Sequence, residues 1–219
     1  EVFINKKIET KSQNYGTLSL ISLAFQEAYL ENNYNSKYFL KLMNSEDGDY
    51  SRYLFFHLKD IINKNDTELA IEISETINYY KSTLLLSQSK KWIENRNFNK
   101  FKKYFSFNSE EDILAEFFFL ISNLYSSQEN YKQSNFYLNI ANYLNPKFYF
   151  NLTMLVENYY MIDDFEKSKS ILNNFQKDDQ IYQWYKIKKI AQIISIQKNE
   201  NVSIKYIEDN FKKISKPDS

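Results

Sequence analysis

The amino-acid sequence predicts an all-α protein built from stacked helix-turn-helix hairpins. Three observations lead to this prediction. Glycine and proline each occur only twice in 219 residues, apolar residues recur at intervals of three and four, and one type of helix position recurs about every 34 residues. Turns between β-strands draw heavily on glycine and proline, so their scarcity argues against strands. Apolar residues three and four apart form a stripe along one side of an α-helix.

The composition is that of a folded protein without a strong charge. Hydrophobic residues make up 43% and charged residues 26% of the chain, and 28 basic residues balance 28 acidic ones. A net charge of zero gives no long-range attraction to nucleic acid or to an anionic membrane, so no nucleic-acid partner is expected. Cysteine is absent, which excludes disulfides and thiolate metal sites. No apolar run reaches the roughly 18 residues of a membrane span, so the chain is not expected to span a membrane.

The helical pattern is weakest over residues 15–110, where degenerate repeats are expected. Their apolar positions are Leu20, Leu23, Ala24, Leu40, Leu54, Leu58, Ile61, Leu85, Trp92, Phe98 and Phe105.

The pattern is clearest over 111–147. One helix carries the stripe Ile113, Leu114, Phe117, Phe118, Ile121, Leu124 and Tyr125. After a polar break, a second helix with Tyr131, Leu138 and Ala141 runs toward Pro146, and proline cannot continue a helix. Two further repeats are predicted over 148–181 and 182–214. Their stripes are Leu152, Leu155, Val156, Tyr159 and Leu172, and then Ile187, Ile190, Ala191, Ile194 and Ile207.

One position in each second helix is expected to face the first helix of its hairpin. These positions are Ser36, Ala70, Phe101, Ser134, Ser168 and Ser203, at spacings of 34, 31, 33, 34 and 35 residues. Five of the six are Ser or Ala, which allow two helices to cross closely. Phe101 is the exception and predicts a locally widened hairpin.

These spacings resemble the tetratricopeptide repeat, a helical hairpin of roughly 34 residues. The residues that carry the resemblance are Phe118, Ile121, Ser122, Tyr125, Ser134, Leu138, Ala141 and Pro146. The resemblance implies a right-handed α-solenoid of about six repeats, forming one domain over 1–219. The segment 115–185 also resembles repeats of bacterial cell-envelope proteins, which favours the bacterial periplasm over the cytoplasm.

The sequence offers little for catalysis, and the protein is not expected to be an enzyme. His57 is the only histidine, and we expect it to be partly buried and hydrogen-bonded to a neighbour. With glycine only at 16 and 48, no glycine-rich phosphate loop is possible. The acidic pairs at 163–164 and 178–179 fall at turns, where Asp caps the following helix. The same is expected of the acids at 47 and 49. No metal and no cofactor are expected.

The segment 98–107, FNKFKKYFSF, interleaves bases with aromatic residues as in proteins that stack on single-stranded nucleic acid. Helical spacing is the simpler explanation, because it places Phe98, Phe101 and Phe105 on one buried face and the lysines in solvent.

The tetratricopeptide resemblance places a partner on the concave side, which the first helices of the hairpins line. The implied partner-binding residues are Phe119, Asn123, Phe150, Thr153, Glu157, Tyr160, Lys188 and Gln192. Their amide, hydroxyl and aromatic groups suit an extended peptide.

We therefore expect a non-catalytic scaffold that binds a partner peptide or protein. Two alternatives stay open: an RNA-binding helical repeat, and the docking arm of a larger envelope assembly. The chain begins at Glu1 without a methionine, so we expect either a removed leader or a piece of a longer protein.

Overall fold

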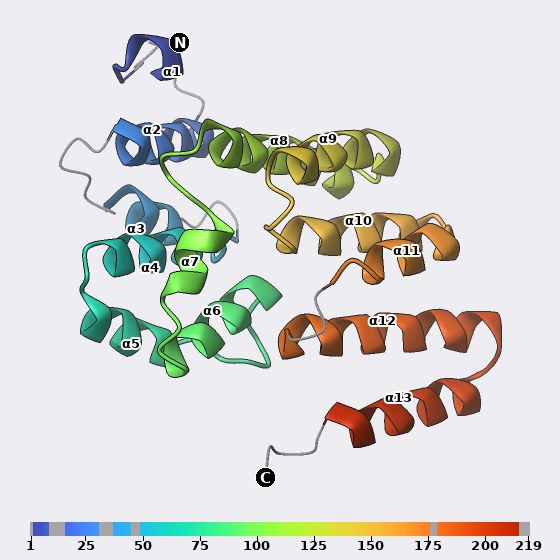
Figure 1. Cartoon of the computed structure of the whole chain (residues 1–219). Helices are drawn as coiled ribbons and strands as arrows, with labels where there is room; N and C mark the ends of the chain where they lie inside the picture. The colour runs from blue at the N-terminus through green and yellow to red at the C-terminus, as the bar shows by residue number, and fades with distance from the viewer. Residues whose placement is uncertain (1, 9–15, 31–36, 45–48, 176–178, 215–219) are drawn as a thin grey trace. The chain divides into compact units, whose positions relative to one another are not determined.

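The chain is all-helical in the computed structural model, which describes residues 2–8, 16–30, 37–44, 49–175 and 179–214 (Figure 1). Within these ranges there are helices and turns but no strand. The helices are α1 (Val2–Asn5), α2 (Thr17–Leu30), α3 (Lys37–Met43), α4 (Tyr53–Asn63), α5 (Thr67–Glu75), α6 (Leu84–Glu94), α7 (Asn99–Tyr104), α8 (Glu110–Ser127), α9 (Tyr131–Leu144), α10 (Phe150–Met161), α11 (Phe165–Leu172), α12 (Gln180–Gln197) and α13 (Glu200–Ile214).

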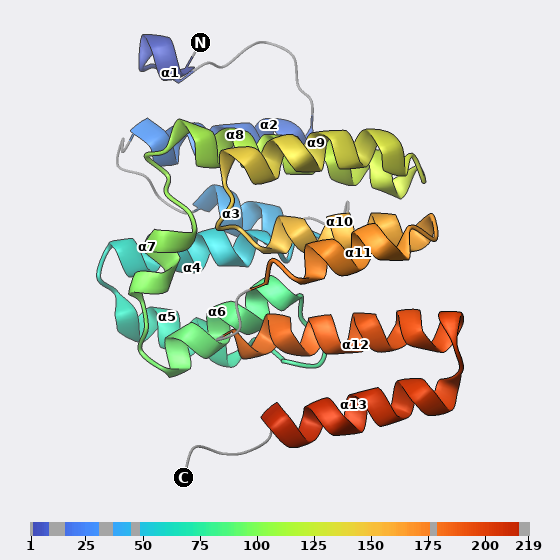
Figure 2. The ribbon, with the colours of Figure 1, turned by 45° about the vertical axis from the view of Figure 1, so that its right-hand side comes forward.

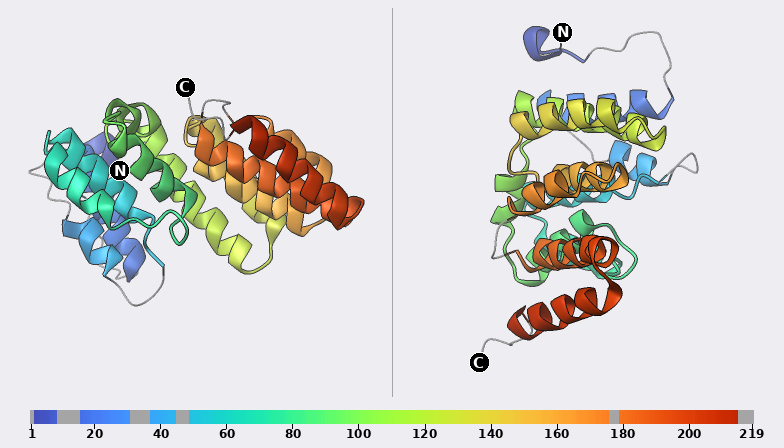
Figure 3. Two further views of the ribbon diagram at one scale, coloured as in Figure 1. Left: turned by 90° about the horizontal axis from the view of Figure 1, so that it is seen from below. Right: turned by 90° about the vertical axis from the view of Figure 1, so that its right-hand side faces the viewer.

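The helices fall into two compact units. Unit 1 contains residues 1–117 and 143–148, and unit 2 contains residues 118–142 and 149–219, so the division falls within α8. In unit 2, α10 packs against α11 and α12 packs against α13, as the views in Figures 2 and 3 also show. None of the described helices has the length and apolarity that a membrane crossing requires.

Four hairpins in the described ranges, α4–α5, α6–α7, α8–α9 and α10–α11, share one turn geometry. In each turn, one residue adopts a positive φ between 51° and 63°, and these residues are Asn65, Arg96, Glu129 and Asp163. The amide of the following residue then donates to a carbonyl five positions back in the first helix, as Asn130 N does to Tyr125 O at 2.9 Å. This left-handed turn satisfies carbonyls that the end of a helix leaves free.

The residue after each left-handed position is Asp or Asn, and at three of these positions it caps the second helix. The side chains of Asp66, Asn130 and Asp164 accept from the backbone N–H three residues later. Asn199 does the same before α13, and Asp179 before α12. The capping predicted for the acidic pair 163–164 is confirmed for Asp164, whereas Asp163 holds the left-handed position. Residues 47 and 178 lie outside the described residues.

Each described hairpin has one buried residue on each helix, twelve positions apart, and we call these two residues its crossing residues. The described pairs are Leu58 with Ala70, Ser89 with Phe101, Ser122 with Ser134, Val156 with Ser168, and Ala191 with Ser203. In two consecutive hairpins the second-helix serine donates to the first-helix carbonyl, Ser168 to Val156 at 3.3 Å and Ser203 to Ala191 at 2.8 Å. The predicted burial of these second-helix positions is confirmed, except that Ser36 lies outside the described residues.

Unit 1 has an aromatic core. Phe56 contacts Phe25 and Phe105 edge-on, with ring centroids 5.0 Å and 4.9 Å apart. The other buried rings of this core include Phe39, Tyr53, Phe55, Phe101, Tyr104, Phe107 and Phe148. Aromatic rings fill large volumes and pair favourably in edge-on geometry, so these contacts stabilise the core.

The ionisable side chains buried in unit 1 include Arg52, Lys59 and Glu116. Arg52 forms an ion pair with Glu116 through two hydrogen bonds, Nε to Oε1 at 2.9 Å and Nη2 to Oε2 at 2.5 Å. Lys59 donates to the Phe101 carbonyl at 3.3 Å, and burial lowers the pKa of its ammonium to about 8. Such groups are costly to bury, and each here has compensating partners.

The stripe predicted along 113–125 is only partly buried, which corrects the sequence-based expectation. Ile113 is buried, but Leu114, Ile121 and Leu124 are exposed. A buried neighbour of this stripe is instead Phe119, on a different side of α8. The periodic pattern identified the helix correctly, but helix periodicity does not tell which side meets another element.

Candidate protein-binding surface

The candidate surface lies on unit 2 and is formed by the first helices of its hairpins, which are the C-terminal part of α8, α10 and α12. We call this surface the A-helix face. It comprises the residues that occupy equivalent positions on the three helices, which are Phe119, Asn123 and Ser126 on α8, Phe150, Thr153, Glu157 and Tyr160 on α10, and Tyr185, Lys188, Gln192 and Ser195 on α12.

Helices α8 and α10 are joined by one aromatic contact and one polar network. The rings of Phe119 and Phe150 lie 5.8 Å apart. Ser126 donates to the side-chain carbonyl of Asn158 at 2.8 Å, and the Asn158 amide donates to Ser134 and Asn135 on α9 at 2.7 and 2.8 Å. Asn158 is buried, so this one amide ties the first hairpin of unit 2 to the second.

Helices α10 and α12 are joined by charged and hydrogen-bonded groups. The Glu157 carboxylate accepts from the Tyr185 hydroxyl at 2.7 Å and from the Lys189 ammonium at 2.7 Å. Tyr185 also contacts the Thr153 carbonyl at 3.2 Å, and Lys189 lies 4.3 Å from the centre of the Tyr160 ring. Burial, and then the neighbouring Glu157 charge, raise the pKa of the Tyr185 hydroxyl far above its usual value, so the hydroxyl stays a donor.

The eight predicted partner-binding residues fall into three groups. Asn123, Lys188 and Gln192 are exposed, and Phe150, Glu157 and Tyr160 are half-buried. Phe119 and Thr153 are buried, Phe119 against Phe150, and Thr153 with its hydroxyl donating to the Phe150 carbonyl. Phe119 thus packs between α8 and α10, the Thr153 hydroxyl bonds within α10, and neither side chain presents its group to solvent.

Two residues central to this arrangement were missed by the sequence-based analysis. Lys189 lies next to the predicted Lys188, yet its side chain is buried against Glu157 and Tyr160 while Lys188 is exposed. Asn158 was not among the predicted stripe residues, and the residues at the equivalent positions of α8 and α12 are the apolar Leu124 and Ile193. A polar residue at an otherwise apolar position was the available signal, because buried amides are kept where they have partners.

The other residues considered for chemistry have structural surroundings. His57 is buried in unit 1, and burial lowers its pKa. Its Nδ1 has no hydrogen-bond partner among the described residues, so the expected hydrogen bond is not found at this atom. In the segment 98–107, Phe101 and Phe105 are buried and Phe98 is half-buried, but α7 ends at Tyr104 and Phe105 is extended, so helical spacing does not account for the burial of Phe105. Nowhere in the described ranges do three or more acidic or histidine side chains form a group that could hold a metal ion.

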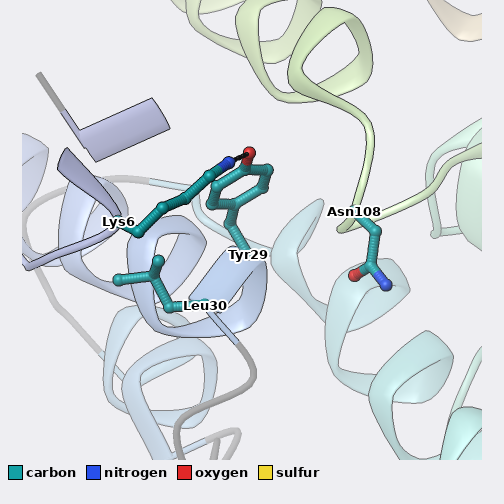
Figure 4. A pocket seen from close by; sticks show the side chains of 4 residues that line it. All are labelled: Lys6, Tyr29, Leu30 and Asn108. Atoms are coloured by element: carbon teal, nitrogen blue, oxygen red, sulfur yellow. Dashed lines mark hydrogen bonds between the residues drawn. The ribbon is translucent and has the colours of Figure 1, made fainter. Parts of the chain in front are cut away.

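A shallow polar hollow in unit 1 is lined by Lys6, Tyr29, Leu30 and Asn108 (Figure 4). The Lys6 ammonium donates to the Tyr29 hydroxyl, which donates in turn to Glu110 at 2.7 Å. Lys6 and Glu110 also lie within ion-pair distance, at 3.6 Å. The charges around this hollow are thus compensated within the protein.

Comparisons with protein-family models, with curated proteins and with solved structures give no match to this chain.

Proposed function

We propose that this protein is a non-catalytic scaffold of tetratricopeptide-like hairpins, arranged as an α-solenoid, that binds an extended segment of a partner protein along the A-helix face. We also propose that this scaffold acts in a bacterial periplasm.

The observation that supports this most strongly is the recurrence of one hairpin design. In four of the five described hairpins a left-handed residue precedes the buried crossing residue of the second helix by five positions, as Glu129 precedes Ser134 and Asp163 precedes Ser168. Asp or Asn always stands four positions before it. Repeated hairpins built in this way stack in register, and stacked first helices form an extended surface rather than a closed pocket.

The chemistry of the A-helix face suits a peptide. Asn123 and Gln192 occupy equivalent positions on α8 and α12, and both are exposed. Their amide groups can donate and accept, as a peptide backbone requires. The exposed Lys188 adds a cation for an acidic side chain of the partner. Contacts between the helices hold this face in place before binding, which lowers the entropy cost of association.

The proposal is tested with a partner identified by crosslinking and mass spectrometry in the native cell. Binding of that partner's segment to the full chain is then measured by calorimetry. The triple variant Asn123→Ala/Lys188→Ala/Gln192→Ala should weaken binding by at least about tenfold, since alanine substitution in an interface costs on the order of 1 kcal/mol for each important side chain.

A matched control changes the same three residue types on second helices. Gln133, Asn201 and Lys205 are exposed on α9 and α13. Their triple alanine variant should bind like the unmodified protein, and circular dichroism should show unchanged helicity for both variants. Equal weakening by the two variants, or none by the first, would rule out the A-helix face as the binding surface.

A further inference from the structure

The first helix of unit 2 exposes an apolar side that the next two hairpins bury. The first helices can be aligned on their buried crossing residues, which are Ser122, Val156 and Ala191. In this alignment Leu124 corresponds to Asn158 and to Ile193. Leu124 is 58% exposed, whereas Asn158 and Ile193 are 1% and 0% exposed.

Ile121 behaves like Leu124. It is exposed, whereas its counterpart Leu155 on α10 is buried. We call the side of α8 formed by Phe118, Ile121 and Leu124 the leading face. On α10 the corresponding side meets the preceding hairpin, because Asn158 donates to Asn135 on α9. The leading face is therefore the side by which an inner hairpin contacts its predecessor.

The last described helix of unit 2 has the complementary feature. We call the side of α13 formed by Ile204, Ile207 and Phe211 the trailing face. Aligned on Ser134 and Ser203, Ile204 corresponds to Asn135, the residue of α9 that meets the following hairpin. Asn135 is 6% exposed and Ile204 is 47% exposed.

We propose that the trailing face of one copy of this chain docks on the leading face of a second copy. Ile204 and Leu124 stand at the positions of Asn135 and Asn158, which are hydrogen-bonded to each other between α9 and α10, so this contact would continue the stacking of unit 2 across two molecules. Both faces expose large apolar side chains, Leu124 on the leading face and Ile204 and Phe211 on the trailing face. Burial of Leu124, Ile204 and Phe211 then provides the driving force.

This contact is heterologous, because two different surfaces meet, and it can continue into rows of copies. Each face has only three large apolar side chains, so the interface belongs to the small and weak class below about 1,200 Å². The inference depends on the hairpin register and not on peptide binding. The triple alanine variant of the A-helix face should therefore self-associate like the unmodified chain.

The experiment is sedimentation velocity of the full chain from low to high micromolar concentration. The unmodified chain should shift from 26.4 kDa toward multiples of this mass as concentration rises. Leu124→Glu and Ile204→Glu should each stay at the single-copy mass, because each places a charge on one of the two faces. An equimolar mixture of the two variants should form a complex of twice the mass and nothing larger, since each supplies the intact face that the other lacks.

Phe136→Glu is the matched control. Phe136 is 59% exposed on α9, and its counterparts Ser170 and Lys205 are exposed as well, so it lies outside both faces. This variant should self-associate normally, and circular dichroism must show that all three variants are folded. The proposal is overturned if the unmodified chain keeps one mass at every concentration, if either face variant alone still associates, if the mixture does not recover a complex, or if the control variant loses association.

Discussion

Replacement of Arg52 by methionine should strongly destabilise unit 1, because it leaves the Glu116 carboxylate buried without its counter-charge. The Glu116 side chain has no exposed surface, and Arg52 supplies both of its charged hydrogen bonds. Removal of one partner from a buried ion pair typically costs about 3 to 5 kcal/mol. We expect a loss of this size in the free energy of unfolding at neutral pH.

The unfolding of unit 1 can be measured separately from that of unit 2, because each unit contains one of the two tryptophans. Trp92 is buried in unit 1 and Trp184 lies in unit 2, so in a Trp184→Phe background the fluorescence of Trp92 reports the unfolding of unit 1 in urea. The double variant Arg52→Met/Glu116→Leu should recover most of the lost stability, since an apolar pair of similar volume is often as stable as a buried ion pair. A single-variant loss below about 1 kcal/mol would refute the reasoning.

Three further predictions concern the hairpins and a buried lysine. Glu129→Gly should stabilise unit 2 by about 1 kcal/mol in urea unfolding, because glycine adopts the left-handed conformation without strain; an unchanged or lower stability would contradict this. Ser168→Leu should destabilise unit 2 by about 2 kcal/mol or more, since a bulky side chain at the crossing separates the helices, whereas Ser170→Leu on the exposed side of α11 should be near neutral. The pKa of Lys59 is lowered to about 8 in the folded state, so the unfolded chain binds more protons between about pH 8 and pH 10.5, and stability should rise over this range by at most about 3 kcal/mol. The free energy of unfolding of Lys59→Met should rise less over this pH range, and an equally steep rise in this variant would show that other groups cause it.

The sequence was sufficient to predict the hairpins because their construction is local. Crossing residues, caps and turns all lie within about 34 residues of one another, and each leaves a signal of its own. One such signal was overlooked. Asp or Asn stands four positions before every described crossing residue of a second helix, at 66, 97, 130, 164 and 199. Phe101 at this position is buried, with its ring against Phe55 and Trp92.

The pairings between distant parts of the chain could not be predicted. Arg52 and Glu116 are 64 positions apart, and the residues around either one do not indicate that the other is its partner. The exposure of Leu124 and the burial of Phe119 have a similar cause, because both depend on which neighbour lies against each side of α8. Helical periodicity is a property of one helix, whereas burial is a property of a pair.

The two junctions of the A-helix face should respond differently to a partner. Phe119 and Phe150 join α8 to α10 through an apolar contact, which salt does not weaken. Glu157 and Lys189 join α10 to α12 through an ion pair whose carboxylate is 43% exposed, so salt and a competing cation on a partner can reach it. A basic group of a bound peptide that pairs with Glu157 would release Lys189 from the carboxylate, while the Tyr185 hydroxyl could still donate to it. We therefore expect the contacts between α10 and α12 to change when a partner binds, and the contact between α8 and α10 to stay the same.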